Sequence, residues 1–97
     1  MAGTLWFEIT ASDIRLAQRN GRHGIRAGRV TSEGTSEFLK AHFEMSGKSL
    51  IFRVEGAANP VHLGGKSSQP HLVAAALVSD YSKLNGEIPH VQYKDWL

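Results

Sequence analysis

The 97-residue chain contains no cysteine and no long apolar run, and each absence excludes a class of protein. Without cysteine there can be no disulfide, no thiol nucleophile and no cysteine-based zinc site. No apolar stretch approaches the roughly 20 residues that a membrane-spanning helix needs. The first eight residues, Met-Ala-Gly-Thr-Leu-Trp-Phe-Glu, have neither the basic nor the apolar region of a signal peptide. We therefore expect a cytoplasmic protein that does not enter a membrane.

The composition that remains is typical of one small globular domain. Apolar residues make up 41% of the chain and charged residues 21%, which is too apolar for a disordered segment. The length suits a single hydrophobic core, so residues 1–97 are predicted to form one domain.

The net charge of +2 hides an uneven distribution along the chain. Residues 1–31 contain five arginines against only Glu8 and Asp13, whereas the remaining residues contain six basic and seven acidic side chains. Five of those six later basic residues are lysine. Because the planar arginine fork suits phosphate and carboxylate groups, the sequence indicates a localised anion-binding surface in its first third.

The dipeptide Asn20-Gly21 lies midway between two runs of alternating residues, which is the strongest short-range signal for a β-hairpin. A hairpin folded there places Arg19 opposite Arg22, because side chains alternate between the two faces of a strand. It gathers four arginines on one face: Arg15, Arg19, Arg22 and Arg26. Like charges opposite one another are unfavourable in a sheet. The arrangement therefore predicts an anionic ligand, with neighbouring carboxylates or plain solvent as the simpler explanations.

A short helix is the alternative for residues 11–20. Thr10 would be its N-cap, Asp13 would lie in its first turn, and Gly21 would end it. The alanine, leucine, glutamine and arginine residues of this segment favour helix. Arg15 and Arg19 would again share a face, because they are four residues apart. The hairpin is our prediction, and a basic cluster is expected under either interpretation.

A second hairpin is predicted around Gly47-Lys48, a glycine-first pair that suits a type II′ turn. Residues 39–45 and 50–54 alternate cleanly on its two sides. The predicted register joins three apolar pairs on one face: Met45 with Leu50, Phe43 with Phe52, and Ala41 with Val54. On the reverse face it pairs Lys40 with Glu55, and it sets His42 opposite Arg53.

The C-terminal half is predicted to contain a helix and one more strand. Residues 56–68 are a glycine-rich loop with room for a short extended piece. A helix follows over about 69–85, with Pro70 in its first turn, Gly86 as its stop and an apolar stripe facing a sheet. The stripe consists of Val73, Leu77, Tyr81 and Leu84. Val91 and Tyr93 indicate a short final strand, which Pro89 confines to a sheet edge.

These elements predict an α+β fold. The expected architecture is an antiparallel sheet of five or six strands built from two hairpins. A single C-terminal helix partly covers one face, and a short edge strand ends the chain. This arrangement does not account for the burial of Trp6, Ile51 and Trp96. Exposed apolar groups commonly mark an association surface, so a homodimer is a further expectation.

The five histidines and two Gly-Lys-Ser tripeptides were the other candidates for chemistry. No two histidines are three to five residues apart, so no local metal-ligand pair exists and no metal site is predicted. Both Gly-Lys-Ser tripeptides lack the earlier glycine of a phosphate-binding loop. His62 stands out only because it lies in the glycine-rich loop, where functional residues concentrate. We predict no catalytic residue and no cofactor.

The sequence thus predicts a small non-enzymatic binding protein that captures an anionic partner through the arginine-rich segment. The partner would be a nucleic acid, a nucleotide or an acidic protein surface. His23 would add a donor to the four arginines when protonated. One alternative is a protein–protein interaction module, such as a small inhibitor or adaptor, acting through an aromatic edge of Trp6, Tyr93 and Trp96. A second alternative is a histidine-dependent enzyme using His62.

Overall fold

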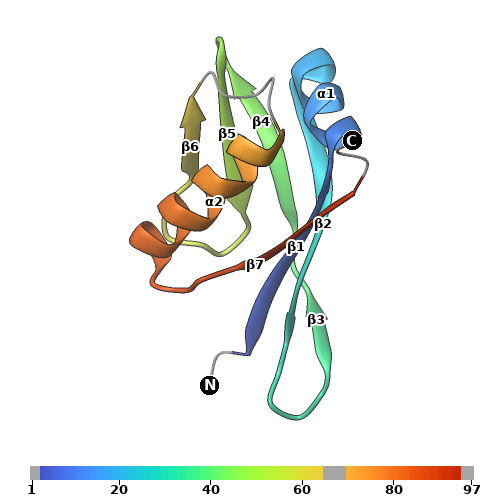
Figure 1. Cartoon of the computed structure of the whole chain (residues 1–97), viewed down its shortest axis with the longest axis vertical. Coiled ribbons are helices and arrows are strands. Elements are labelled where there is room, and N and C mark those ends of the chain that lie inside the picture. Colours follow the sequence, from blue (N-terminus) through green and yellow to red (C-terminus); the bar gives the residue numbers. More distant parts are fainter. Residues whose placement is uncertain (1–2, 65–69, 95–97) are drawn as a thin grey trace.

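The chain forms one curled, mostly antiparallel sheet with two helices (Figure 1). A computed structural model describes residues 3–64 and 70–94. The elements in chain order are β1 (Thr4–Thr10), α1 (Ala11–Asn20), β2 (Arg22–Val30), β3 (Ser36–Phe38), β4 (Ala41–Ser46), β5 (Ser49–Val54), β6 (Val61–Gly64), α2 (Pro70–Asn85) and β7 (His90–Lys94). The strands are ordered β6-β5-β4-β2-β1-β7, with the short β3 pairing to β2 as a seventh strand. The predicted α+β class is confirmed.

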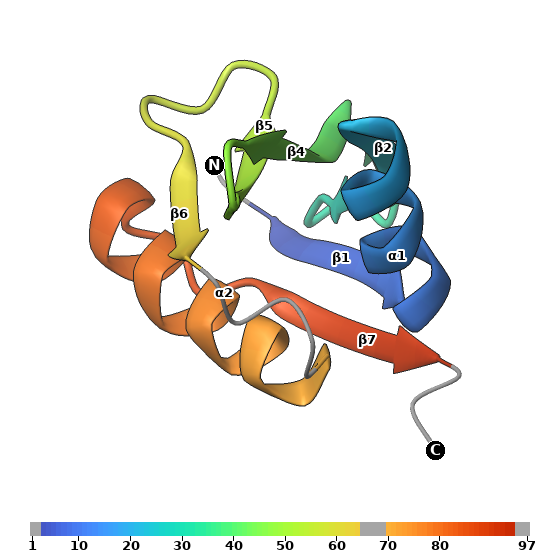
Figure 2. The same cartoon turned by 90° about the horizontal axis from the view of Figure 1, so that it is seen from above.

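The curl of the sheet brings its two edge strands to the same side of the molecule. Figure 2 shows α2 lying between β6 and β7, and α2 contacts both strands. The first helix packs on β1, β2 and β4. The Cα radius of gyration of 12.7 Å is close to the roughly 13 Å of a compact domain of 100 residues. Of the two described helices, neither combines the length and apolar character needed to cross a membrane.

The predicted hairpin at Asn20-Gly21 is wrong, and the helical alternative is correct for residues 11–20. Thr10 and Asp13 form a capping box: the Thr10 hydroxyl accepts from the Asp13 amide at 3.0 Å, and the Asp13 carboxylate accepts from the Thr10 amide at 2.7 Å. Gly21 ends the helix with φ of 84°, donating its amide to the Ala17 carbonyl. Capping at both ends, together with good helix formers between them, outweighed the hairpin signal.

The predicted second hairpin is confirmed with its register. Met45 pairs with Leu50, Phe43 with Phe52 and Ala41 with Val54 across β4 and β5. Gly47 has φ of 61° in the connecting turn, as the first central residue of a type II′ turn requires. A further hairpin joins β2 to β3, where Arg29 pairs with Glu37.

The C-terminal helix and the final strand are also confirmed. Gly86 ends α2 with φ of 74°, and Val73, Leu77 and Tyr81 are buried under the sheet. Leu84 was expected in the same stripe but remains 45% exposed in the last turn. Strand β7 is an edge strand, and it runs parallel to β1 because α2 carries the chain back before it pairs.

The core lies on the inner, concave face of the sheet. Phe7, Phe43 and Phe52 contact one another or Tyr81 of α2 with ring centroids 4.9 to 6.5 Å apart. The predicted fold did not explain the burial of Trp6, Ile51 and Trp96, and the structure now shows the packing of two of them. Ile51 is 5% exposed, and Trp6 packs against Gly28 on the outer face. Trp96 lies outside the described residues.

Candidate functional site: a basic pocket on the outer sheet face

Strand β2 divides its side chains between the two faces of the sheet. Ala27 belongs to the buried core, and Ile25 packs against it, so this alternate set faces inward. Arg22, Gly24 and Arg26 therefore face outward. Arg15 and Arg19 lie instead on the exposed surface of α1. The four arginines occupy two elements as two pairs, and the single strand face predicted for them does not form.

His23 lies on the inner set of β2, away from Arg22 and Arg26. Its Nε2 atom is 3.0 Å from Oδ1 of Asp13, whose other oxygen caps α1. The imidazole thus links β2 to the start of α1. His23 therefore contacts the carboxylate of Asp13 and does not lie beside the outward-facing Arg22 and Arg26.

Arg15, Arg19, Arg22 and Arg26 are not locked to carboxylates. Among residues 3–64 and 70–94, none of these four guanidinium groups forms an ion pair within 4.0 Å. Arg29 behaves differently, because Glu87 accepts from two of its nitrogens at 2.5 and 3.3 Å, which raises the pKa of Arg29. Arg29 is thus paired with a carboxylate, whereas the other four arginines are not paired within the described residues. Anion binding by these four arginines stays a prediction.

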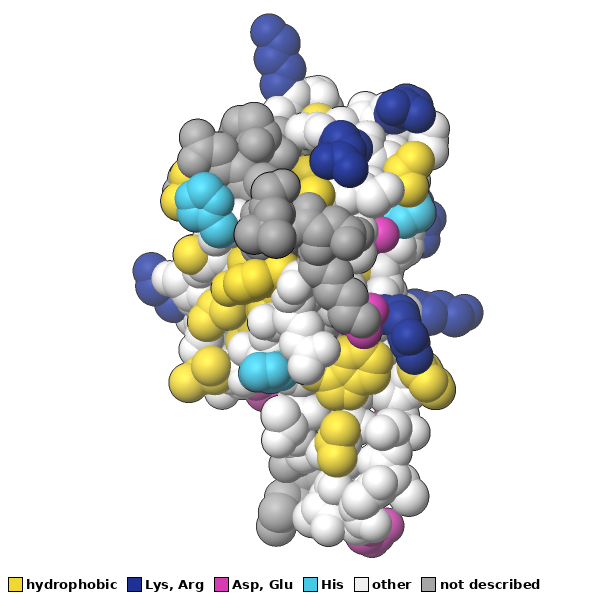
Figure 3. All heavy atoms as spheres, turned by 45° about the vertical axis from the view of Figure 1, so that its right-hand side comes forward, with side chains coloured by type: hydrophobic (Ala, Val, Ile, Leu, Met, Phe, Trp, Pro, Cys, Tyr) yellow, Lys and Arg dark blue, Asp and Glu magenta, His cyan; other side chains and the backbone are white. Residues whose placement is uncertain are grey.

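Figure 3 shows how the charges are distributed over one side of the molecule. Lysine and arginine side chains surround the upper end and the margins of this view, whereas the lower projection shows none. That projection is the hairpin of β2 and β3, which carries Glu33 and Glu37. Positive charge is therefore concentrated away from the hairpin tip.

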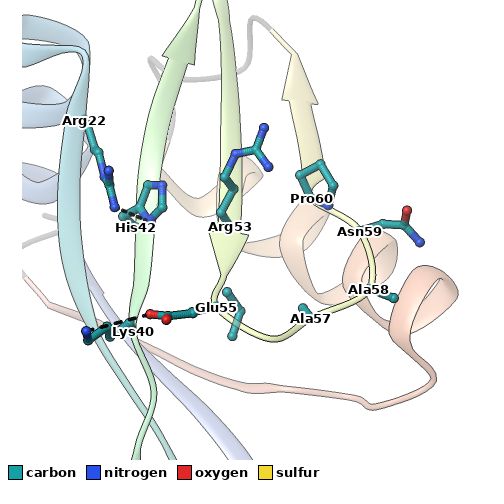
Figure 4. Close-up of a pocket in the computed structure, with 10 residues that line it drawn as sticks. Arg22, Lys40, His42, Arg53, Glu55, Ala57, Ala58, Asn59 and Pro60 are labelled. Atoms are coloured by element: carbon teal, nitrogen blue, oxygen red, sulfur yellow. Dashed lines mark hydrogen bonds and ion pairs between the residues drawn. The ribbon is translucent and has the colours of Figure 1, made fainter.

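Arg22 borders an open pocket of about 480 Å³ on the outer face of the sheet (Figure 4). Three further basic side chains line it, namely Lys40 just before β4, His42 on β4 and Arg53 on β5, together with Glu55 and Asn59. The connection of Ala57 to Pro60, between β5 and β6, forms the opposite wall. Pairing of β2 with β4 sets Gly24 directly beside His42, where a glycine leaves the surface open. The pocket thus gathers three cationic side chains and an imidazole from three strands.

Arg22 and His42 are hydrogen-bonded to each other on one side of the pocket (Figure 4). A guanidinium nitrogen of Arg22 is 3.5 Å from Nδ1 of His42. Because a guanidinium can only donate, Nδ1 must accept, and the ring proton of neutral His42 is on Nε2. That Nε2 atom is buried, makes no hydrogen bond with any residue in the described part of the chain, and lies 3.7 Å from Oε1 of Glu44.

The other two cations of the pocket each face a carboxylate. Arg53 donates to Glu44 at 3.0 Å, and this hydrogen bond lowers the pKa of Glu44. Lys40 is 4.0 Å from Glu55, with both side chains largely exposed. Burial of the ring, and then the positive charge of Arg22, lower the pKa of His42. At neutral pH the pocket therefore combines an unpaired guanidinium, two ion pairs and an uncharged imidazole.

Sequence reasoning identified Arg22 but missed its neighbours in the pocket. The predicted register already set His42 opposite Arg53 and Lys40 opposite Glu55, and both alignments are observed. The missing signal was the pairing of β2 with β4, which brings Arg22 to the same place. A non-local strand pairing of this kind leaves no short-range mark in the sequence.

The residues of the predicted aromatic edge are spread over two strands. Trp6 lies on the outer face of β1 and lines a second open pocket with Val30 and His90. Tyr93 is 50% exposed on β7. Trp96 lies outside the described residues, and so does the tripeptide at 65–67.

The predicted loop around His62 contains a short strand. His62 is exposed on β6, and within the described chain it makes no hydrogen bond or ion pair. No group of three or more histidine, aspartate or glutamate side chains in that same part of the chain could hold a metal ion. The enzyme alternative gains no supporting geometry here.

The chain was compared with protein-family models, curated proteins and solved structures, and none of them matches it. The pocket is therefore the feature that indicates a candidate function.

Proposed function

We propose that this protein is a small, non-enzymatic, cytoplasmic binding protein that captures an anionic group in the pocket beside Arg22. One observation carries the proposal. The Arg22 guanidinium has no carboxylate within ion-pair distance in the described chain, yet it borders an open pocket with two further cations. A free guanidinium at the wall of a concave site offers two parallel donors to phosphate or carboxylate.

Lys40 and Arg53 would support this anion from either side of the pocket. Each already forms an ion pair with a carboxylate, so each would attract an anion less strongly than an unpaired cation does. Arg22 is thus the residue on which the affinity should depend most.

The size of the pocket favours a compact ligand over a polymer. A volume of about 480 Å³ lies within the usual range for small-molecule sites, roughly 300 to 1,000 Å³. A nucleotide or another phosphate- or carboxylate-bearing molecule fits this range. A nucleic acid or an acidic protein surface would also need the second arginine pair, Arg15 and Arg19 on α1.

The test measures binding of inorganic phosphate, a nucleoside triphosphate and a single-stranded oligonucleotide to wild type and to two matched variants. Arg22→Gln should weaken binding of the compact anions by about ten- to a hundredfold, because a charge-assisted hydrogen bond contributes roughly 1.5 to 3 kcal/mol. Arg19→Gln, an exposed arginine outside the pocket, should leave that binding unchanged.

The outcome also separates the partner classes. A polyanionic partner would lose affinity steeply with added salt and would respond to Arg19→Gln as well. If wild type binds no probe even at low salt, or if Arg22→Gln binds as wild type does, the pocket has no role in anion capture.

A second candidate function rests on three apolar side chains that remain exposed on β3, just before β7 and on β7. Phe38 and Ile88 are 75% exposed, and Tyr93 is 50% exposed on the edge strand β7. A partner protein or a second copy of the chain could cover them, which would make the protein an interaction module or a homodimer. Sedimentation of wild type and of Phe38→Ser tests this candidate, and a wild type that remains monomeric at high concentration excludes the homodimer.

A further inference from the structure

The histidine of the basic pocket is placed to respond to an anion. The ring of His42 is 16% exposed, and its Nδ1 atom is held by Arg22 on the pocket side. Its Nε2 atom is buried without a hydrogen bond. Within the described chain, the one hydrogen bond that this ring accepts comes from Arg22, the group that would bind the ligand, and Glu44 is 3.7 Å from its Nε2 atom.

The two arginines beside His42 disfavour protonation of its ring. Arg22 faces the ring from β2 and Arg53 from β5, and both disfavour protonation. Glu44 on β4 favours it, but Glu44 is already hydrogen-bonded to Arg53. The remaining charged side chains on the walls are Lys40 and Glu55, which face each other. Gly24, beside the ring on β2, adds no group at all.

An anion entering the pocket changes both parts of this balance. Its oxygens compete for the donors of Arg22, because a charge-assisted hydrogen bond to an anion is stronger than one to a neutral imidazole. The Nδ1 lone pair of His42 is then released. The negative charge of the ligand also offsets the two guanidinium groups that oppose a charged ring.

We propose that binding of an anion at Arg22 is coupled to uptake of one proton from solvent by Nδ1 of His42, which then becomes a further hydrogen-bond donor to the anion. This inference rests on the proposed function and adds a regulator to the same site. Affinity for the anion rises as the pH falls, and by linkage the bound anion favours protonated His42 to the same extent.

Inorganic sulfate is the suitable probe, because its charge does not change over the range in which histidine titrates. Calorimetric titrations at about pH 6 and about pH 8 should show wild type binding sulfate roughly three- to tenfold more tightly at the lower pH. This lies within the limit for one linked proton, which is about tenfold for each pH unit. Titration in two buffers of different ionisation enthalpy should show net proton uptake on binding.

Two variants assign the effect to a residue. His42→Gln keeps a neutral polar side chain of similar reach and should abolish both the pH dependence and the proton uptake. His62→Gln is the control, because His62 is an exposed histidine on the same sheet that does not line the pocket, and this variant should behave as wild type.

The failure of this inference differs from the failure of the proposed function. Sulfate binding that requires Arg22 but is independent of pH, or a pH dependence that survives in His42→Gln, overturns the proton coupling alone. Absence of sulfate binding at both pH values overturns both proposals. If His42→Gln fails to fold, the imidazole resonances of wild type decide: the titration midpoint of His42 should rise when sulfate is added, and an unchanged midpoint overturns the coupling.

Discussion

The two faces of the curled sheet are made from the same strands and differ in almost every physical property. On β4, Ala41 and Phe43 point into the core, while His42 and Glu44 point outward. The inner face holds the apolar core and is covered by two helices, with the His23–Asp13 and Arg29–Glu87 pairs at its margins. The outer face carries ion pairs, histidines and two glycines, and no helix of the described chain packs on it.

This difference separates stability from recognition within one layer of protein. Aromatic packing on the inner face supplies most of the free energy of folding, because buried apolar area dominates that balance. The outer face can then carry charges whose pairing is incomplete, such as Arg22, at little cost. We therefore expect substitutions on the two faces to have very different effects even at adjacent positions.

The sharpest form of this comparison uses neighbouring residues on β5. Phe52 is 1% exposed and contacts three aromatic rings, so Phe52→Ala should lower the free energy of unfolding by about 3 to 5 kcal/mol. Arg53→Ala, the next residue on the opposite face, should cause a far smaller loss, because surface ion pairs contribute little. Urea denaturation of both variants measures the difference, and equal losses would contradict the division between the faces.

The outer face also contains one position where packing is tight. A methyl group on Gly28 would stand 2.6 Å from Cζ2 of Trp6 and 2.8 Å from the Glu37 carbonyl oxygen, so Gly28→Ala should cost about 1 to 3 kcal/mol. Gly24 faces the same way, but its nearest neighbour would be 3.8 Å away. Gly24→Ala should therefore be neutral or stabilising by up to about 1 kcal/mol. Thermal unfolding compares the two variants, and a stable Gly28→Ala protein would show that Trp6 moves freely.

A smaller loss of stability is expected at the capping box that begins α1. Thr10→Ala removes one half of the capping box and should cost about 1 kcal/mol, within a range of roughly 0.5 to 2. Ser12→Ala changes an exposed residue in the first turn of the same helix and should be nearly neutral. Chemical denaturation distinguishes them. Indifference to Thr10→Ala would mean that packing of Ile14 and Ala17 alone holds the helix in place.

The smallest effect is a pH dependence from the outer face. Burial, followed by the charge of Arg22, lowers the pKa of His42 in the folded state below its ordinary value. The unfolded chain therefore binds more protons at this residue once the pH falls through about 6.5, and folding stability decreases on acidification. His42→Gln should lose less stability than wild type between neutral and mildly acidic pH. Parallel urea titrations test this, and identical acid sensitivity would mean that His42 is not desolvated in solution.

Two segments with similar turn signals show how far the sequence could be interpreted. Residues 39–55 form the predicted hairpin in its predicted register, because alternation, turn glycine and cross-strand charges all agree. Residues 11–27 carry an equally clear Asn-Gly pair, but their first half is also rich in helix formers and has caps at both ends. There the local signals conflict, and the helix forms. Helix α2 and edge strand β7 were predictable for the same reason as the second hairpin, namely consistent local patterns.

The candidate site could be predicted only in part. Arg22 was identified from its place in the arginine-rich segment, whereas Lys40, His42 and Arg53 were not. Arg15 and Arg19 were expected beside Arg22 on one strand face, and the helix sets them on another element.

By itself the sequence determined the elements whose local signals agree, namely the hairpin of β4 and β5, helix α2 and strand β7, because side-chain periodicity and capping act over a few residues. Tertiary structure decided how the strands were ordered, and above all that β2 would pair with β4 as well as β1. That pairing depends on the shape of the whole core, since several strand orders satisfy the same local pattern. The basic pocket exists because of this pairing, which brings Arg22 beside His42.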